Sequence, residues 1–400
     1  MEPTSTQEPP VTARRAALRE LVALFLRMGF TAFGGPAAHI ALFEDEVVRR
    51  RRWLSHERFL DLLGVTNLIP GPNSTEMVIH IGLLRAGVLG MVVAGLSFIV
   101  PAACITAVFA WFYVRFGSVP QAEGLLYGVK PVVIAVIAQA LWSLGPRAIK
   151  SRALGALAAA CAAAVWFGAG ELTVLVLGGV VMAVARGVQD GPRRHALGLA
   201  ALCTIVLLVI TAILLAPAWT AGEARPFSLG ALFLFFLKVG SVLYGSGYVL
   251  LAFIDSSLVE HWQWITNTQL LDAVAVGQVT PGPLFTTSTF IGFLLAGATG
   301  ATVATLGIFL PSFLFVAISG PIIPRMRASA LAGAFLDGVV AASLALMAVV
   351  TLQLGMGSLR DPMSVLIALV SAGLLYRYKL STTWLILGGA AIGLARTALM

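Results

Sequence analysis

The sequence has few charged residues: Asp, Glu, Lys and Arg make up 11% of its 400 residues. Soluble domains carry about 25% of such residues, so the composition argues against a soluble fold. Hydrophobic residues make up 59%, and apolar runs close to the roughly 20 residues that cross a bilayer recur from residue 87 to the end. The sequence therefore predicts an all-α polytopic membrane protein embedded in the lipid bilayer.

The sequence also lacks the features of several enzyme and binding classes. Its three cysteines, Cys104, Cys161 and Cys203, lie unpaired in apolar runs, as small core residues do. Without His/Cys ligand spacing or a Walker loop, we expect no metal, no cofactor, no enzymatic activity and no direct use of ATP. The net charge of +8 comes largely from short connections between apolar runs, which indicates membrane orientation rather than nucleic-acid binding.

What the sequence does contain is an internal repeat. Residues 25–72 align without gaps on residues 236–283, and after one deletion the register continues to residues 145 and 355. Each copy carries a Pro-Gly-Pro motif that must interrupt a helix, which we call the first knot (Pro70–Pro72) and the second knot (Pro281–Pro283). The repeat predicts an N-terminal cytoplasmic tail (1–17), a first repeat (18–187), a linker with one extra transmembrane helix (188–228) and a second repeat (229–398).

The charges predict that the two repeats have inverted topology. The run Arg49–Arg52 lies in repeat one, whereas the matching residues 255–269 contain no Lys or Arg. The positive-inside rule places the first connection in the cytoplasm and the second outside, with a cytoplasmic N-terminus. We expect about 13 hydrophobic segments, with broken or re-entrant helices over residues 20–48, 57–84, 229–254 and 265–296. Inverted repeats of this kind recur in secondary transporters.

Two basic residues hold matching positions in apolar arms, Arg27 and Lys238. A basic residue in the middle of a membrane helix costs about 2.5–3.5 kcal/mol on insertion scales, so a matched pair predicts a shared anion site. The alternative is that both side chains snorkel to a membrane interface. Lys130 is a third candidate, although Val340 takes its place in repeat two.

The knots offer hydrogen-bond donors to the same anion. A helix that restarts after a knot presents free N–H groups and the positive end of its dipole. Donors and cations held in a low-dielectric site suit a tetrahedral oxyanion. The alternative is that the knots only shape helix packing. The predicted substrate-binding residues of the knots and the turns after them are Pro70, Gly71, Pro72, Asn73, Ser74, Pro281, Gly282, Pro283 and Thr286.

Four side chains are candidates for coupling transport to an ion: Glu76, Asp61, Asp272 and His39. Glu76 fits equally well as a helix-capping partner, three residues after Asn73. The two aspartates hold matching positions and could pair with Arg27 and Lys238 or relay protons. His39 could titrate near neutral pH, although a lone intramembrane histidine is more often a packing residue.

These motifs resemble those of the chromate ion transporter (CHR) family, long-chain two-domain type. The resemblance is carried by residues 33–39 and 67–72 in repeat one and by residues 244–247, 278 and 281–283 in repeat two. It covers nearly the whole chain. It implies secondary active export of chromate, with sulfate as a related anion, across the cytoplasmic (inner) membrane, and thereby chromate resistance. It also adds Gly34, Gly35 and Gly245 to the substrate-binding residues.

Two other classes of function stay open at this point. A passive oxyanion channel would share the positive site and need no coupling residue. A membrane-embedded enzyme, which we favour less, would change its substrate chemically rather than move it. A homodimer is also left open by the sequence.

Overall fold

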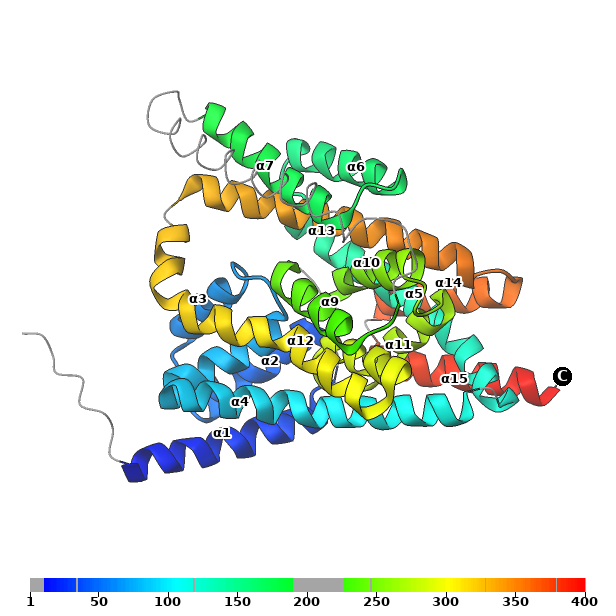
Figure 1. The fold of residues 1–400 in the computed structure, drawn as a ribbon, viewed down its shortest axis with the longest axis horizontal. Helices are drawn as coiled ribbons and strands as arrows, with labels where there is room; N and C mark the ends of the chain where they lie inside the picture. The colour runs from blue at the N-terminus through cyan, green and yellow to red at the C-terminus, as the bar shows by residue number, and fades with distance from the viewer. Residues whose placement is uncertain are drawn as a thin grey trace, which may run out of the picture.

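The computed structural model describes residues 11–33, 35–117, 119–189, 226–244, 247–327, 329–378 and 380–399. Within these ranges the chain is helical, with no β-strand, which confirms the all-α prediction for this part (Figure 1). The predicted linker helix, most of the N-terminal tail, Gly34 and Gly245 lie outside the described residues. Within the part of the chain that the structure describes, five helical stretches are long and apolar enough to cross a membrane: Asn73–Phe116, Glu123–Ala148, Leu284–Ser319, Ala330–Ser358 and Thr382–Leu399.

The two repeats contain similar successions of elements. Repeat one has α1 (Val11–Thr31), α2 (Gly35–Glu44), the π-helix η1 (Asp45–Arg50), α3 (His56–Thr66), α4 (Asn73–Phe116), α5 (Pro120–Ala148), α6 (Arg152–Trp166) and α7 (Glu171–Gln189). Repeat two has α9 (Leu229–Val242), the 3₁₀ helix η2 (Gly247–Val249), α10 (Leu250–Ile254), the π-helix η3 (Asp255–His261), α11 (Asn267–Val279), the 3₁₀ helix η4 (Leu284–Thr286), α12 (Thr287–Arg327), α13 (Ala330–Ser358), α14 (Pro362–Tyr378) and α15 (Thr382–Leu399).

Rare backbone conformations recur at aligned positions of the two repeats. Arg52 and Gln263, which follow the two π-helices, both have positive φ, at 51° and 53°. The long helices α4 and α12 each turn a corner at an Ala-Gly pair, where Gly87 and Gly297 have φ of 66° and 58°. Matched departures from regular helix support a duplicated architecture. The inversion of the repeats and the number of membrane segments remain predictions.

The first helix is longer than the sequence predicted. α1 begins at Val11, whereas a polar tail was expected to reach residue 17. Ala and Leu between residues 16 and 24 favour a helix, and Ala17 and Leu21 are buried while Arg14 and Arg15 are exposed. Its 21 residues span about 31 Å rather than the half-bilayer expected for this arm.

Small residues let helices pack closely at matched places. A Cβ atom on Gly128 of α5 would strike the carbonyl oxygen of Gly389 in α15. In the same way, a Cβ on Gly338 of α13 would strike the carbonyl oxygen of Gly178 in α7. Such contacts are typical of helix packing in membranes. Figure 1 shows α4 running lengthwise through the lower part of the molecule with α1 alongside it, and α12, which also contacts α4, nearer the centre.

Large apolar side chains face outward on several of these helices. Val88, Trp142, Leu352 and Leu369 are all more than half exposed. Exposed apolar surface on this scale is expected where a bilayer covers the protein.

Candidate functional site

The two knots interlock the repeats. The Gly71 N–H donates to the carbonyl oxygen of Leu243 at 2.8 Å, and the Gly282 N–H donates to that of Ala32, also at 2.8 Å. Ala32 and Leu243 hold aligned positions directly after α1 and α9. Each knot therefore binds the helix break of the other repeat, and the exchange is reciprocal.

Both knots require glycine at their centre. Gly71 and Gly282 have φ of 134° and 96°, a region that side-chain-bearing residues rarely adopt. A Cβ on Gly71 would also lie 2.8 Å from Ser312 Oγ in α12, and a Cβ on Gly282 would strike Ala102 in α4. Ser312 and Ala102 are aligned residues. Each knot thus lies against the long helix of the opposite repeat.

The first knot opens directly into the N-terminus of α4. Pro72 offers no side-chain cap, and the Asn73 amide donates instead to Asn67 Oδ1 at 2.7 Å. The first N–H groups of any helix lack intrahelical acceptors, and here Ser74 and Thr75 of that turn are buried. This turn therefore has the unsatisfied N–H groups of a helix start, and anion binding by it stays a prediction.

The capping role considered for Glu76 is wrong. Neither oxygen of its carboxyl group has a hydrogen-bond partner, although both are buried. The side chain does not return to the backbone at the start of α4, because it folds against Gly71.

The second knot differs from the first in its use of hydroxyl groups. The short helix η4 separates it from α12. The hydroxyls of Thr286, Thr287 and Ser288 donate to backbone carbonyls three residues earlier, at 3.0, 2.8 and 2.8 Å. Their protons are thus engaged within the chain. The first knot is the better placed of the two to offer donors to a ligand.

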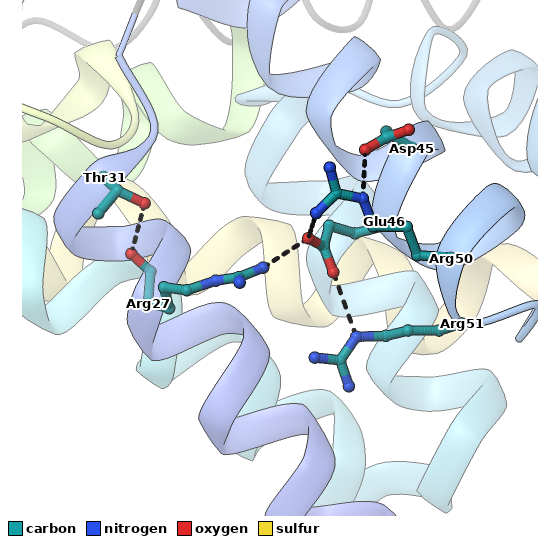
Figure 2. Close-up of polar contacts among 6 residues, drawn as sticks. All are labelled: Arg27, Thr31, Asp45, Glu46, Arg50 and Arg51. Atoms are coloured by element: carbon teal, nitrogen blue, oxygen red, sulfur yellow. Dashed lines mark hydrogen bonds and ion pairs between the residues drawn. The ribbon is translucent and has the colours of Figure 1, made fainter.

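Arg27 lies in an ion cluster around Glu46. Its Nη2 atom is 2.6 Å from Glu46 Oε1, and Arg50 and Arg51 also reach this carboxylate, each at 3.3 Å (Figure 2). The Glu46 side chain is 6% exposed and that of Arg27 is 52% exposed. Burial raises the pKa of Glu46, but the hydrogen bonds from Arg27 and Arg51 outweigh burial and hold this pKa below its usual range.

A second ion pair is buried between the repeats. Lys130 Nζ of α5 lies 3.2 Å from Asp272 Oδ1 of α11, and the Tyr113 hydroxyl of α4 donates to Asp272 Oδ2 at 2.9 Å. The Asp272 side chain is 1% exposed. The sequence had suggested Lys238 as its partner. Two of the three predicted basic residues, Arg27 and Lys130, are thus already paired with carboxylates.

The remaining predicted residues are dispersed. Lys238 is half-buried on α9, and its ammonium group forms no ion pair within the described residues. His39 is buried beside the second knot, with Nε2 3.0 Å from the same Ala32 oxygen that accepts from Gly282. Asp61 is exposed on α3, and Gly35 begins α2.

Sequence reasoning missed three residues of these clusters: Glu46, Tyr113 and Ser312. Glu46 lies on a π-helix, whose altered register hides its position relative to Arg27. Tyr113 and Ser312 contact residues of the other repeat, far away in sequence. Across the described ranges, no group of three or more His, Cys, Asp or Glu side chains is arranged to hold a metal ion.

Comparison with known proteins identifies the family. The family model described as "Chromate transporter" matches residues 19–184 and again residues 230–394. The chain is 30% identical over 392 residues to the chromate transport protein of Cupriavidus metallidurans, covering 97% of this chain and 96% of that protein. It is 33% identical over 384 residues to the chromate transport protein of Pseudomonas aeruginosa, covering 94% and 91%. No solved structure matches the chain. With its two family-model matches and two nearly full-length relatives, this chain belongs to the chromate transporter family.

Proposed function

We propose that this protein is a secondary active transporter that exports chromate across the cytoplasmic (inner) membrane. The names of its relatives support chromate as the substrate. Sulfate, a tetrahedral dianion like chromate, is a second substrate. One observation carries the transport mechanism: each knot binds the helix break of the opposite repeat. Movement of one repeat against the other must therefore rearrange both knots, as alternating access requires.

Inverted topology is part of this proposal. The basic cluster Arg49–Arg52 lies at the end of η1, and the matching turn after η3 has no Lys or Arg. The positive-inside rule then places the first turn in the cytoplasm with the N-terminus, and the second turn outside. The two knots enter the membrane from opposite faces in this arrangement.

The oxyanion binds at the first knot. The first turn of α4 offers N–H groups and the Asn73 and Ser74 side chains next to a positive helix end. Lys238 contributes positive charge to this site, and within the described residues it has no ion pair to break. Arg27 would first have to break its ion pair with Glu46 before it could bind the anion. The second knot, with its hydroxyl protons engaged, acts as a gate.

Membrane potential complicates the distinction from a channel. A cell is electrically negative inside, so the outward movement of two negative charges is favourable by about 4.6 kcal/mol per 100 mV. A passive channel could therefore also expel chromate from a cell. Only transport with the potential held at zero separates the two functions.

The test uses inverted membrane vesicles with and without the protein. Potassium and valinomycin hold the potential at zero, a pH gradient is imposed, and uptake of radiolabelled chromate is followed. We expect accumulation above the external concentration that an uncoupler abolishes. Simple equilibration would indicate a channel, and reduced chromium in the vesicles would indicate an enzyme. Full activity of the Arg27→Ala, Lys238→Ala double variant would refute the charge assignment.

A further inference from the structure

The carboxyl group of Glu76 is buried without any compensating charge. The residue is 0% exposed, and neither carboxyl oxygen has a hydrogen-bond partner. No ion pair of Glu76 with a lysine, arginine or histidine occurs within the described residues. Two other buried carboxylates, Glu46 and Asp272, are each held by at least one cation, whereas Asp255 of η3 is buried with one oxygen unpartnered. In Glu76, both oxygens lack a partner.

The carboxyl group lies where the two repeats meet. A Cβ on Gly71 would strike Glu76 Oε1 and would lie 2.8 Å from Ser312 Oγ, so the carboxyl and this hydroxyl flank the first knot together. Ser312 Oγ and Thr75 Oγ1 are also buried without a hydrogen-bond partner. The knot therefore joins a carboxyl group and two unpaired hydroxyls at the start of α4.

Two titratable side chains lie near this group. His80, one turn further along α4, contacts the Glu76 carbonyl oxygen through Nδ1 at 3.0 Å and Ser319 Oγ of α12 through Nε2 at 3.1 Å. Tyr244, in the break after α9, interacts electrostatically with Glu76. In the surrounding helices, Arg27 and Lys130 are held by Glu46 and Asp272. Lys238 of α9 forms no ion pair with Glu76 either, so within the described residues no cation is paired with this carboxyl group.

An ionised carboxylate in this position would have no paired cation among the described residues and at most neutral hydroxyl donors such as Ser312, so its burial is strongly unfavourable. A protonated carboxyl group is neutral and can donate its proton to the Ser312 hydroxyl. The matching residue in repeat two is Thr287, whose hydroxyl donates to the carbonyl oxygen of Leu284 in η4. The molecule therefore has this site in one repeat only.

We propose that Glu76 is a proton-binding site, and that proton binding and oxyanion binding at the first knot favour each other. This rests on the proposed transport function. The neutral carboxyl group does not repel a dianion at the start of α4, whereas the carboxylate does. By linkage, a bound oxyanion raises proton affinity as much as a bound proton raises oxyanion affinity. Chromate then moves together with one proton, which leaves one net negative charge for the membrane potential to drive outward.

The experiment uses the full chain in liposomes, with the potential held at zero. Sulfate is the probe, because chromate itself takes up a proton near neutral pH. A pH gradient, acid on the side of the labelled sulfate, should drive wild-type accumulation. The Glu76→Gln variant, a neutral isostere, should keep sulfate exchange, with its affinity independent of pH, and lose accumulation. Glu57→Gln, at an exposed carboxylate of α3, is the matched control.

The outcomes separate the site from the transport function. Wild-type protein that neither exchanges nor accumulates chromate or sulfate would refute the proposed function. A Glu76→Gln variant that still accumulates sulfate like the wild type would overturn the proton site alone, as would accumulation driven by a sodium gradient. If the Glu76→Gln variant does not exchange sulfate, infrared difference spectra between acid and alkaline pH provide the test instead. They should show a buried protonated carboxyl band in wild type and Glu57→Gln that is absent from Glu76→Gln. Persistence of that band in Glu76→Gln would also overturn the assignment.

Discussion

Replacement of Gly71 by alanine is expected to disrupt the packing of the first knot against the opposite repeat. At φ of 134°, a Cβ costs roughly 1–3 kcal/mol in backbone strain. The same Cβ strikes Glu76 and lies 2.8 Å from Ser312 Oγ, and overpacking of this kind costs about another 1–3 kcal/mol. We therefore expect a loss of about 2–6 kcal/mol in the free energy of unfolding, together with loss of chromate transport.

Thermal unfolding in detergent, followed by size-exclusion chromatography, measures this effect. Gly145→Ala is the matched control, because a Cβ there meets no atom within 4 Å. Removing a helical glycine should leave that variant as stable as the wild type or more stable by about 0.5–1 kcal/mol. A Gly71→Ala protein with wild-type melting temperature and wild-type transport would refute the role given to the knot.

Three further predictions concern contacts away from the knots. Lys130→Met should lower the free energy of unfolding by about 3–5 kcal/mol, because it leaves Asp272 charged and buried. In a double-mutant cycle, adding Asp272→Asn should restore most of this loss. Purely additive losses would contradict the pairing. Glu46→Gln should cost about 1–2 kcal/mol at neutral pH, discounted because its arginine partners are largely exposed. The pKa of Glu46 is lower in the folded state than in the unfolded state. Its contribution to the free energy of unfolding is therefore complete above the unfolded-state pKa and is lost as the pH falls through the folded-state pKa. Acid titration of stability should therefore bring this variant and the wild type together, and a difference that is independent of pH would exclude the charge effect. Gly338→Val should destabilise by about 1–3 kcal/mol by pushing α13 away from Gly178, with unchanged melting as the contradicting result.

Much of the helical architecture could be predicted because glycine and proline act locally. The break expected at Phe33–Pro36 is found slightly earlier, between the end of α1 at Thr31 and the start of α2 at Gly35. The corners at Gly87 and Gly297 fall close to residues 84 and 296, where the broken helices were expected to end. Backbone constraints of this kind need no knowledge of tertiary contacts. The membrane inversion still rests on charge patterns alone.

The partners of charged residues could not be predicted in the same way. The matching positions in the two repeats left Asp272 either to pair with Lys238 or to relay protons, but the cation brought next to it is Lys130, from the other repeat. Arg27 of α1 meets Glu46 of the π-helix η1, nineteen residues further along the chain. Such pairs depend on how helices cross, and periodicity carries no information about that.

The surroundings of Glu76 could not be predicted from the sequence either. Its spacing from Asn73 fitted a helix cap, because capping depends on local geometry alone. The structure instead turns its carboxyl group toward Gly71 and Ser312, across the contact between repeats. A local rule failed where the knot brings the other repeat close to the helix start.

The central claim, that the interlocked repeats carry chromate by alternating access, is tested most directly by counterflow. Purified protein is placed in liposomes loaded with unlabelled chromate, and a trace of labelled chromate is added outside with the potential held at zero. The account predicts a transient rise of labelled chromate inside above its external concentration, because a carrier exchanges one anion for another. Monotonic equilibration without such an overshoot would contradict it.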